Sequence, residues 1–380
     1  MSKNHAITII GHCSKHKGGE TVQIEKMSQL LNVEHIEDVI DLFEGRYNSI
    51  ASLNYALAEA GHPLLDDIYK LPHFPSKNLL LLSFSQSLAA LVATGAHKKH
   101  RLLSKFYVHH RNEKVFPMLY QNVDLLITES LLANIRGAAY GIPESKMLYF
   151  PHYYPPEAEK YEKAVTEEVT IGVVSRFERG KNCEYALEVC RRIAERYPIK
   201  LILMGDFEKE TTDPHYQEKF REMLECYTKA NWFVWEKQKV PFSQVLEKYN
   251  RFDICLQLSG AEAGSNTIVE LLGMGKPVIA LNASTNPYLF KGGAYLVEAD
   301  PEDRPGQLSY QVPNIDALEA ATEALVREPK LRIEWRRKAQ GLAKKRFHIS
   351  EAQKRLDLLF CEDPAKLQER FNLDRQEYGF

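Results

Sequence analysis

The sequence lacks the features that mark a membrane, secreted or zinc-binding protein. No Cys-x-x-Cys pair or zinc-type spacing occurs among its six cysteines, at positions 13, 183, 190, 226, 255 and 361. No stretch approaches the roughly 18 apolar residues that a membrane-spanning helix needs. The opening run "MSKNHAITIIGHC" has no signal-peptide core. We therefore expect a cytoplasmic protein with reduced, mostly buried cysteines.

The sequence also lacks a charge excess and the common nucleotide-binding motifs. Lys and Arg number 49 against 51 Asp and Glu, so the net charge is −2 and no global positive field attracts nucleic acid. An anionic ligand must therefore be bound by a local cluster of cations. Neither Gly-x-Gly-x-x-Gly nor a Walker loop is present, which argues against a nicotinamide enzyme and against a kinase.

What the sequence does contain is a series of short apolar runs separated by helical patterns. The runs are continuous rather than alternating, which is typical of parallel strands covered on both faces. We predict strands at 6–11, 77–83, 105–110, 124–130, 146–152, 169–175, 199–206, 231–235, 253–259, 276–281 and 294–299. The predicted fold class is α/β, with two Rossmann-like doubly wound domains that face each other across a cleft.

The segment "PPEAEKYEKAVTEEV" (155–169) is charged and poor in large aliphatic residues, so we place the domain boundary there. The expected division is a first domain at 1–158, a linker at 159–168 and a second domain at 169–345. Residues 346–380 have a helical period and no following strand. We expect these C-terminal helices to pack back across the domains.

Ligands of doubly wound sheets bind beyond the carboxyl ends of the strands, so the residues after each predicted strand are candidates. Gly18 and Gly19 follow the first strand, and Lys15 and Lys17 precede them. Glycines at a helix start let an anionic group approach the backbone N–H groups. An ordinary loop is an equally good interpretation.

The predicted strand at 105–110 is followed by a second candidate cluster. His109, His110 and Arg111 stand there, and a strand-end histidine can act as a base or a hydrogen-bond donor. A structural histidine is the alternative. The apolar-then-basic segment 88–111 also contains Lys98, Lys99 and Arg101. It is either a core helix with a solvated basic end, which we favour slightly, or an acceptor or anionic-membrane patch.

The strand at 169–175 is followed by "SRFERGKN". Arg176 and Lys181 lie five positions apart across a turn that contains glycine. Arginine offers a planar fork and lysine a point charge, a pair that suits a diphosphate. A solvated charged turn is the alternative.

The strand at 253–259 is followed by "GAEAGSNTIVELLGMGKPVIAL" (260–281). Ser265, Asn266 or Thr267 can cap a helix that ends at Gly275-Lys-Pro. Thr267-x-x-Glu270 is itself a capping box, which would give Glu270 a purely structural role.

The functional alternative is that Glu262 and Glu270 hold a ligand together. Glu262 precedes the helix and Glu270 lies inside it. A rise of about 1.5 Å per residue separates them by on the order of 10 Å. The helix start between them presents N–H groups and a positive dipole end. A nucleotide sugar spans such a distance, with hydroxyls at both ends and a diphosphate between.

In these motifs the sequence resembles the retaining GT-B glycosyltransferases, in particular glycosyltransferase family 4. The resemblance is strongest over 169–300, where "VVSRFERGKN", "LILMGD" and "GAEAGSNTIVELLGMGKPVIA" occur in the family's order. It implies that Arg176 and Lys181 bind the donor diphosphate, Glu262 contacts the donor sugar and Glu270 accepts from the ribose. His109, or else His110, would lie beside the transferred sugar. The implied donor-binding set is completed by Gly18, Gly19, Gly264, Ser265, Asn266 and Thr267.

The function that the resemblance implies is metal-independent transfer of a hexosyl group from a nucleotide sugar, with retention. UDP is expected rather than GDP, and the acceptor is a glycan, a lipid-linked molecule or a small molecule. A nucleotide-sugar epimerase and a non-catalytic nucleotide-sugar-binding scaffold remain as alternatives. "AGS" at 263–265 departs from the family's common Gly-Phe-Gly, so donor-sugar choice is expected to depend on these residues.

Overall fold

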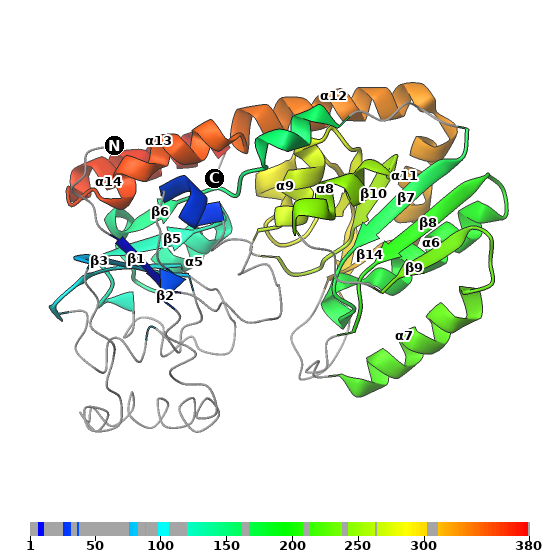
Figure 1. Ribbon diagram of the computed structural model, residues 1–380, viewed down its shortest axis with the longest axis horizontal. Coiled ribbons are helices and arrows are strands. Elements are labelled where there is room, and N and C mark those ends of the chain that lie inside the picture. The colour runs from blue at the N-terminus through cyan, green and yellow to red at the C-terminus, as the bar shows by residue number, and fades with distance from the viewer. Residues whose placement is uncertain are drawn as a thin grey trace. The chain divides into compact units, whose positions relative to one another are not determined.

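The chain forms two compact units in the computed structural model. The structure describes residues 7–10, 26–31, 36–37, 76–82, 88, 98–105, 120–161, 167–207, 213–237, 242–262, 264–301 and 311–378. The first unit comprises Met1–Pro151 and Gln353–Phe380, and the second comprises His152–Ala352 (Figure 1). Pro156–Lys160 forms a short 3-10 helix, η3, across the boundary expected between the first domain and the linker, and its Ala158 is buried in the second unit.

The first unit contains a six-stranded parallel sheet in the order β2-β1-β3-β4-β5-β6. Its interior strands are rich in leucines and isoleucines that are almost fully buried, as their continuous apolar runs predicted. The strands are β1 Ile7–Ile10, β2 Ile36–Glu37, β3 Asn78–Leu81, β4 Arg101–Lys105, β5 Leu125–Thr128 and β6 Met147–Tyr149. The helix α5 (Leu131–Ala139) and the 3-10 helix η2 (Glu144–Lys146) connect β5 to β6.

The second unit contains a six-stranded parallel sheet in the order β12-β11-β10-β7-β8-β9. Counted from β7, this is the order 3-2-1-4-5-6 of dinucleotide-binding sheets. The strands are β7 Val169–Val174, β8 Ile199–Met204, β9 Phe233–Glu236, β10 Ile254–Gln257, β11 Val278–Leu281 and β12 Tyr295–Val297. A separate antiparallel pair is formed by β13 (Ala299–Pro301) and β14 (Gln311–Pro313).

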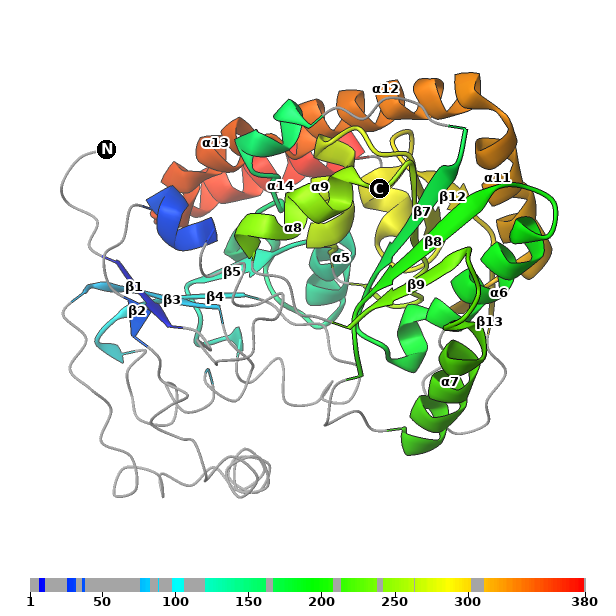
Figure 2. The same ribbon diagram turned by 45° about the vertical axis from the view of Figure 1, so that its right-hand side comes forward.

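Helices cover both faces of the second sheet, as expected when connections run from β7 in one direction and from β10 in the other. Figure 2 shows α6 and α7 on one side of β7, β8 and β9, and α8 and α9 on the other. The helices are α6 Cys183–Ala194, α7 Pro214–Tyr227, α8 Phe242–Asn250, α9 Asn266–Gly273, α10 Asn286–Phe290, α11 Ile315–Arg327 and α12 Pro329–Arg346. The main core joins strand residues to α6, α7 and α11.

Of the strand predicted at 105–110, the structure describes Lys105, the last residue of β4, and residues 106–110 lie outside the described part of the chain. The structure has the strand at Arg101–Lys105, inside the segment read as a helix with a solvated basic end. Burial of Leu102 and Leu103 between β3 and β5 decides this placement. The strands β2, β13 and β14 were not predicted, and the run "AYLVEA" divides between β12 and β13.

The C-terminal helices include a buried ion pair. Arg355 on α13 (Ile349–Leu359) donates to the carboxylate of Asp374 on α14 (Pro364–Tyr378) at 2.9 Å, and both side chains are almost fully buried. Arg370 binds the same carboxylate. The guanidinium of Arg101 donates to the carbonyl oxygens of Leu359 (2.6 Å) and Cys361 (2.8 Å), so this predicted patch residue satisfies carbonyls at the end of α13.

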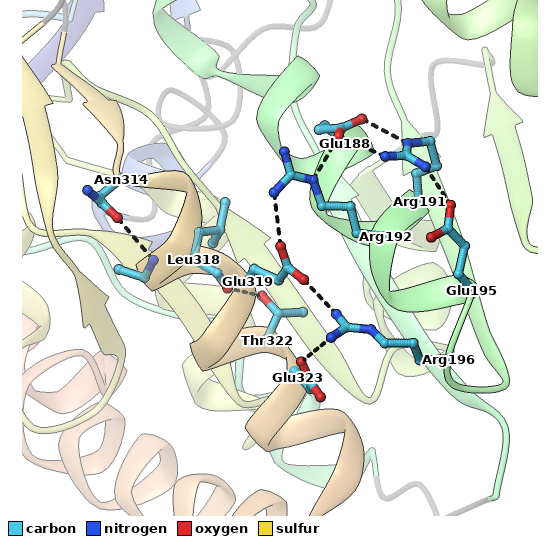
Figure 3. Close-up of polar contacts among 11 residues, drawn as sticks. Glu188, Arg191, Arg192, Glu195, Arg196, Asn314, Leu318, Glu319, Thr322 and Glu323 are labelled. Carbon is cyan, nitrogen blue, oxygen red and sulfur yellow. Dashed lines mark hydrogen bonds and ion pairs between the residues drawn. The ribbon is translucent and has the colours of Figure 1, made fainter.

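An ion-pair network joins α6 to α11 (Figure 3). Arg192 and Arg196 on one side bind Glu319, at 3.1 and 2.6 Å, and Arg196 also reaches Glu323. Hydrogen bonds from Arg191 and Arg192 lower the pKa of Glu188 to about 2. The network fixes α6, which begins directly after the loop that carries Lys181.

No described helix is long and apolar enough to cross a lipid bilayer.

We predict that Asp374→Asn destabilises the first unit by roughly 3–5 kcal/mol, because it leaves the buried Arg355 guanidinium without a carboxylate. All three tryptophans lie in the second unit, at 232, 235 and 335. Urea unfolding followed by far-UV circular dichroism should therefore show the loss more strongly than tryptophan fluorescence. Asp357→Asn, on the exposed side of α13, is the matched control. Equal midpoints for the two variants would contradict the prediction.

Gly273→Ala should destabilise the second unit by roughly 1–3 kcal/mol, although alanine is the better helix former. A Cβ at Gly273 would lie 2.4 Å from the ring of the buried Tyr154. Gly341→Ala is the control. A Cβ added at Gly341, on the exposed side of α12, would meet no described atom within 4 Å apart from the backbone of its own helix. We expect that control to stabilise by about 0.5–1 kcal/mol. Tryptophan fluorescence during urea unfolding measures both changes, and a gain in stability for both variants would refute the steric argument.

Candidate functional site

The candidate site lies where the strand order of the second sheet reverses. The strands β7 and β10 are parallel neighbours, and the chain leaves them in opposite directions, toward β8 and toward β11. Their following loops therefore meet at the carboxyl edge of the sheet, without a helix between them. These are the two loops that contain Arg176, Lys181 and Glu262.

The loop after β7 is held by one buried aromatic side chain. Phe177 is fully buried, its N–H donates to the carbonyl oxygen of Asp206 (3.0 Å), and its ring contacts Phe207 and Phe220 edge to face. The preceding Arg176 has a side chain that is 54% exposed and pairs with Glu178 at 3.2 Å. A half-exposed, ion-paired guanidinium is thus presented from a loop that a buried side chain anchors.

Asn182, at the end of this loop, was not predicted as a site residue. It adopts the left-handed conformation, with φ of 56°, and is 1% exposed. Its side-chain amide donates to the carbonyl oxygens of Leu258 (2.8 Å) and Gln311 (2.9 Å). Asparagine tolerates this backbone conformation better than most residues. The sequence signal was an asparagine at the helix boundary after "RGK", where η4 (Arg179–Lys181) meets α6.

Lys181 and Glu262 form an ion pair across the reversal point. The Lys181 ammonium also donates to the Ser259 hydroxyl at 3.3 Å, and the Gly260 N–H donates to the Gly180 carbonyl oxygen at 2.9 Å. Both charged side chains are largely buried. The structure therefore brings together two residues that lie 81 positions apart in the chain.

A third loop contributes to the same place. The turn after β11 contains Ser284, whose hydroxyl accepts from the Glu262 N–H (3.2 Å) and donates to the Glu262 carbonyl oxygen (2.8 Å). Ser284 was not predicted, because its contact joins two loops that are separate in the sequence.

The cap of α9 is Ser265, one of the three candidates that the sequence offered, and this excludes the alternative of a capping box at Thr267. Ser265 is the N-cap, and its hydroxyl accepts from the Ile268 N–H at 3.2 Å. Thr267 therefore lies inside the helix, and the predicted Thr267-x-x-Glu270 box is wrong. The helix ends as predicted: Gly275 has φ of 68°, and hydrogen bonds from Gly275 and Lys276 close a Schellman motif.

Glu270 is buried on α9, with 3% exposure, and after the Ser265 cap it lies two positions beyond the third helical residue, where a capping-box glutamate stands. Thr267 hydrogen-bonds the hydroxyl of the buried Tyr249, on α8. Burial raises the pKa of Tyr249, and the negative charge of Glu270 raises it further. Tyr249 therefore stays a neutral phenol beside Glu270 at physiological pH.

Several predicted residues fall elsewhere. Lys98 and Lys99 are exposed at the amino end of β4, at the edge of the first sheet opposite the strand carboxyl ends. At the carboxyl end of β4, Lys105 is buried and paired with Glu129 at 2.8 Å. The patch residues that the structure describes, Lys98, Lys99 and Arg101, therefore lie together at the amino end of β4. The remaining candidates lie outside the described residues: Lys15, Lys17, Gly18, Gly19, His109, His110 and Arg111.

A family model supplies the assignment. Residues 156–342 match the family described as "Glycosyl transferases group 1". The second unit is a group 1 glycosyltransferase domain. Arg176, Lys181, Glu262 and Glu270 all lie inside the matched range, which agrees with the resemblance found in the sequence. No match was found among curated protein sequences.

Solved structures show that the fold is that of the GT-B glycosyltransferases. HepE from Anabaena, in complex with UDP and glucose, is similar at a TM-score of 0.69 with 14% identity, over 94% of this chain and 99% of that one. Sucrose-phosphate synthase from Thermosynechococcus elongatus gives 0.64 and 13%, over 93% and 98%. A glycosyltransferase from Rickettsia africae gives 0.65 and 16%, over 94% and 98%. The predicted fold class is confirmed.

We predict that Asn182 holds the loop after β7, residues 175–182, in place. Asn182→Ala should cost roughly 2–3 kcal/mol, because the buried Leu258 carbonyl and the part-buried Gln311 carbonyl lose their donor. Alanine at this positive φ also has a Cβ but no side-chain amide to stabilise the conformation. Asn182→Gly relieves the backbone cost alone and should cost about 1 kcal/mol less. Urea unfolding measures the loss of stability in each variant, and the affinity for UDP measures whether the loop after β7 is still held in place. Equal stability of both variants would show that the backbone conformation is unimportant.

Proposed function

We propose that the protein transfers a hexosyl group from a UDP-sugar to an acceptor hydroxyl, with retention of the anomeric configuration and without a metal ion. The group 1 domain supports the class of reaction. The single observation that carries the proposal is the meeting of Lys181 and Glu262 at the reversal point of the sheet, where the loop of Lys181 also carries the half-exposed guanidinium of Arg176.

The charges of the site suit a diphosphate that arrives and leaves. Arg176 pairs with Glu178, and Lys181 pairs with Glu262, so each cation already has a carboxylate partner. A bound diphosphate would exchange places with these carboxylates as the partner of the cations. Glu262 would then be released to accept hydrogen bonds from the donor sugar.

The chemical step breaks the bond between the anomeric carbon and the diphosphate oxygen and forms a bond from that carbon to the acceptor oxygen. The acceptor's proton leaves with the departing diphosphate or passes to solvent. Negative charge grows on the leaving group, and the fixed cations together with the starts of α6 and α9 stabilise it. Both helices begin at the carboxyl edge of the sheet.

UDP is the proposed nucleotide because the Anabaena HepE structures contain UDP and UDP-glucose. The buried Glu270 on α9, with Thr267 and Tyr249 beside it, is the proposed acceptor of the ribose hydroxyls. Among the described residues, no group of three or more His, Cys, Asp or Glu could hold a metal ion, and metal independence stays a prediction. The acceptor is proposed as a glycan, a lipid-linked molecule or a small molecule.

We predict that Arg176→Ala and Lys181→Ala each lower turnover of the nucleotide sugar by roughly 100-fold or more, because each removes a fixed charge from the leaving group. Lys338→Ala, an exposed cation paired with Glu334 on α12, is the matched control. A thermal-shift screen of UDP- and GDP-sugars selects the donor, since a ligand of the folded state raises stability directly. Turnover is then measured as release of UDP.

Three outcomes would replace the proposal. Wild-type turnover in either variant refutes the assignment of the cations. Conversion of UDP-N-acetylglucosamine alone into a rearranged nucleotide sugar identifies an epimerase. Binding of a nucleotide sugar without transfer or hydrolysis, with any acceptor, identifies a non-catalytic scaffold.

A further inference from the structure

Ser284 has an unfavourable backbone conformation. It lies in the turn after β11 with φ of 54°, and Asn182 is the other described residue that is not glycine and has a positive φ. A serine in this region is uncommon, because its Cβ approaches the neighbouring carbonyl oxygen. Conformations of this kind persist when surrounding contacts impose them, and they cluster at functional sites.

The two residues after Ser284 add to the cost of this turn. The Thr285 hydroxyl and the Asn286 side-chain carbonyl are buried and have no hydrogen-bond partner in the described part of the chain. The Asn286 amide group donates to the Leu281 carbonyl oxygen at 3.0 Å and so fixes the turn to the end of β11. Buried polar atoms without partners are rare in native proteins and call for an explanation. Three consecutive residues are thus held in an unfavourable arrangement.

What this arrangement achieves is a double hydrogen bond to the main chain of Glu262. The Ser284 hydroxyl accepts from the Glu262 N–H and donates to the Glu262 carbonyl oxygen, at 3.2 and 2.8 Å. Both functions of a hydroxyl, donor and acceptor, are therefore used on one residue. The peptide groups on both sides of the Glu262 Cα are held, which sets the direction of its side chain.

Glu262 is thus held at two points by different partners. Lys181 binds the carboxylate, and Ser284 binds the main chain. When a diphosphate binds Lys181, the Glu262 carboxylate loses its ion pair, but the Glu262 main chain keeps its two hydrogen bonds to Ser284. The direction of the Glu262 side chain then depends on Ser284.

We propose that Ser284 is a positioning residue, which keeps the Glu262 carboxylate directed at the donor sugar after Lys181 has turned to the diphosphate. This inference rests on the proposed function, because it needs Glu262 to contact the sugar. It separates the site into two parts. Contacts to the nucleotide do not require Ser284, whereas the contact that distinguishes a UDP-sugar from UDP does.

The test compares two variants that lack the hydroxyl. Ser284→Gly also removes the backbone strain, whereas Ser284→Ala keeps it. If the serine served the turn alone, glycine would replace it without loss, so Ser284→Gly separates positioning from structure. Thr228→Ala is the control. This change removes an exposed hydroxyl that donates to the Glu225 carbonyl oxygen (2.9 Å) at the end of α7. The chain continues from there to the amino end of β9, away from the strand carboxyl ends that carry the candidate site.

The measurement is calorimetric binding of UDP and UDP-glucose to the full chain, with UDP-galactose and UDP-N-acetylglucosamine in parallel. The quantity compared is the ratio of the Kd for UDP to the Kd for the UDP-sugar. We expect Ser284→Gly and Ser284→Ala to leave the Kd for UDP within about twofold and to lower the ratio by about 10-fold, the effect of losing one well-placed hydrogen bond. Ser284→Gly should melt at or above the wild-type temperature, and Thr228→Ala should keep the wild-type ratio.

Glu262→Gln distinguishes failure of this inference from failure of the proposed function. It should lower the ratio as Ser284→Gly does, and the double variant should lose no more than Glu262→Gln alone, because both changes remove one contact. A wild-type ratio in Ser284→Gly, together with a lowered ratio in Glu262→Gln, overturns the positioning role. Multiplied losses in the double variant also overturn it. A wild-type ratio in Glu262→Gln overturns the assignment of Glu262 itself, and the role of Ser284 with it.

Discussion

The ion pair between Lys181 and Glu262 joins loops that follow two adjacent parallel strands whose connections run in opposite directions. Without a helix between them, the two loops leave their polar groups unsatisfied unless they meet each other or a ligand. The ion pair, together with the hydrogen bond from Gly260 to Gly180, satisfies part of this requirement. The same charges suit the diphosphate and the sugar of the proposed donor, so one geometric constraint underlies both the ion pair and the proposed chemistry.

The surrounding structure keeps this constraint in place. Asn182 connects the loop after β7 to Leu258 and to Gln311, and the network between α6 and α11 holds the two helices that begin near these contacts. Ser284 holds Glu262 from a third loop. These hydrogen bonds and ion pairs hold the loops of Lys181 and Glu262, while the Arg176 side chain stays half exposed. This division suits a site that must present fixed charges and still exchange one partner for another.

Local patterns were sufficient where a residue's environment is set by its own segment. The strands of the second sheet were located by continuous apolar runs, and the end of α9 by Gly275 and Pro277. Local patterns failed where a contact with a distant part of the chain decides the structure of a segment. The segment with Arg101 and Lys105 was read as a helix end, but β3 and β5 recruit it as a strand, and Arg101 serves the carbonyl groups after α13. The capping box at Thr267 failed because Ser265 starts the helix two residues earlier.

By itself the sequence determined the fold class, the strand positions of the second unit and the candidates Arg176, Lys181, Glu262 and Glu270, because apolar periodicity and motif spacing are local properties of the chain. Only the tertiary structure decided which of these meet. The pairing of Lys181 with Glu262, the role of Asn182 and the double hydrogen bond from Ser284 all join residues from separate strand ends. Their proximity depends on the strand order, and a strand order that reverses at β7 and β10 cannot be read from any single stretch of residues.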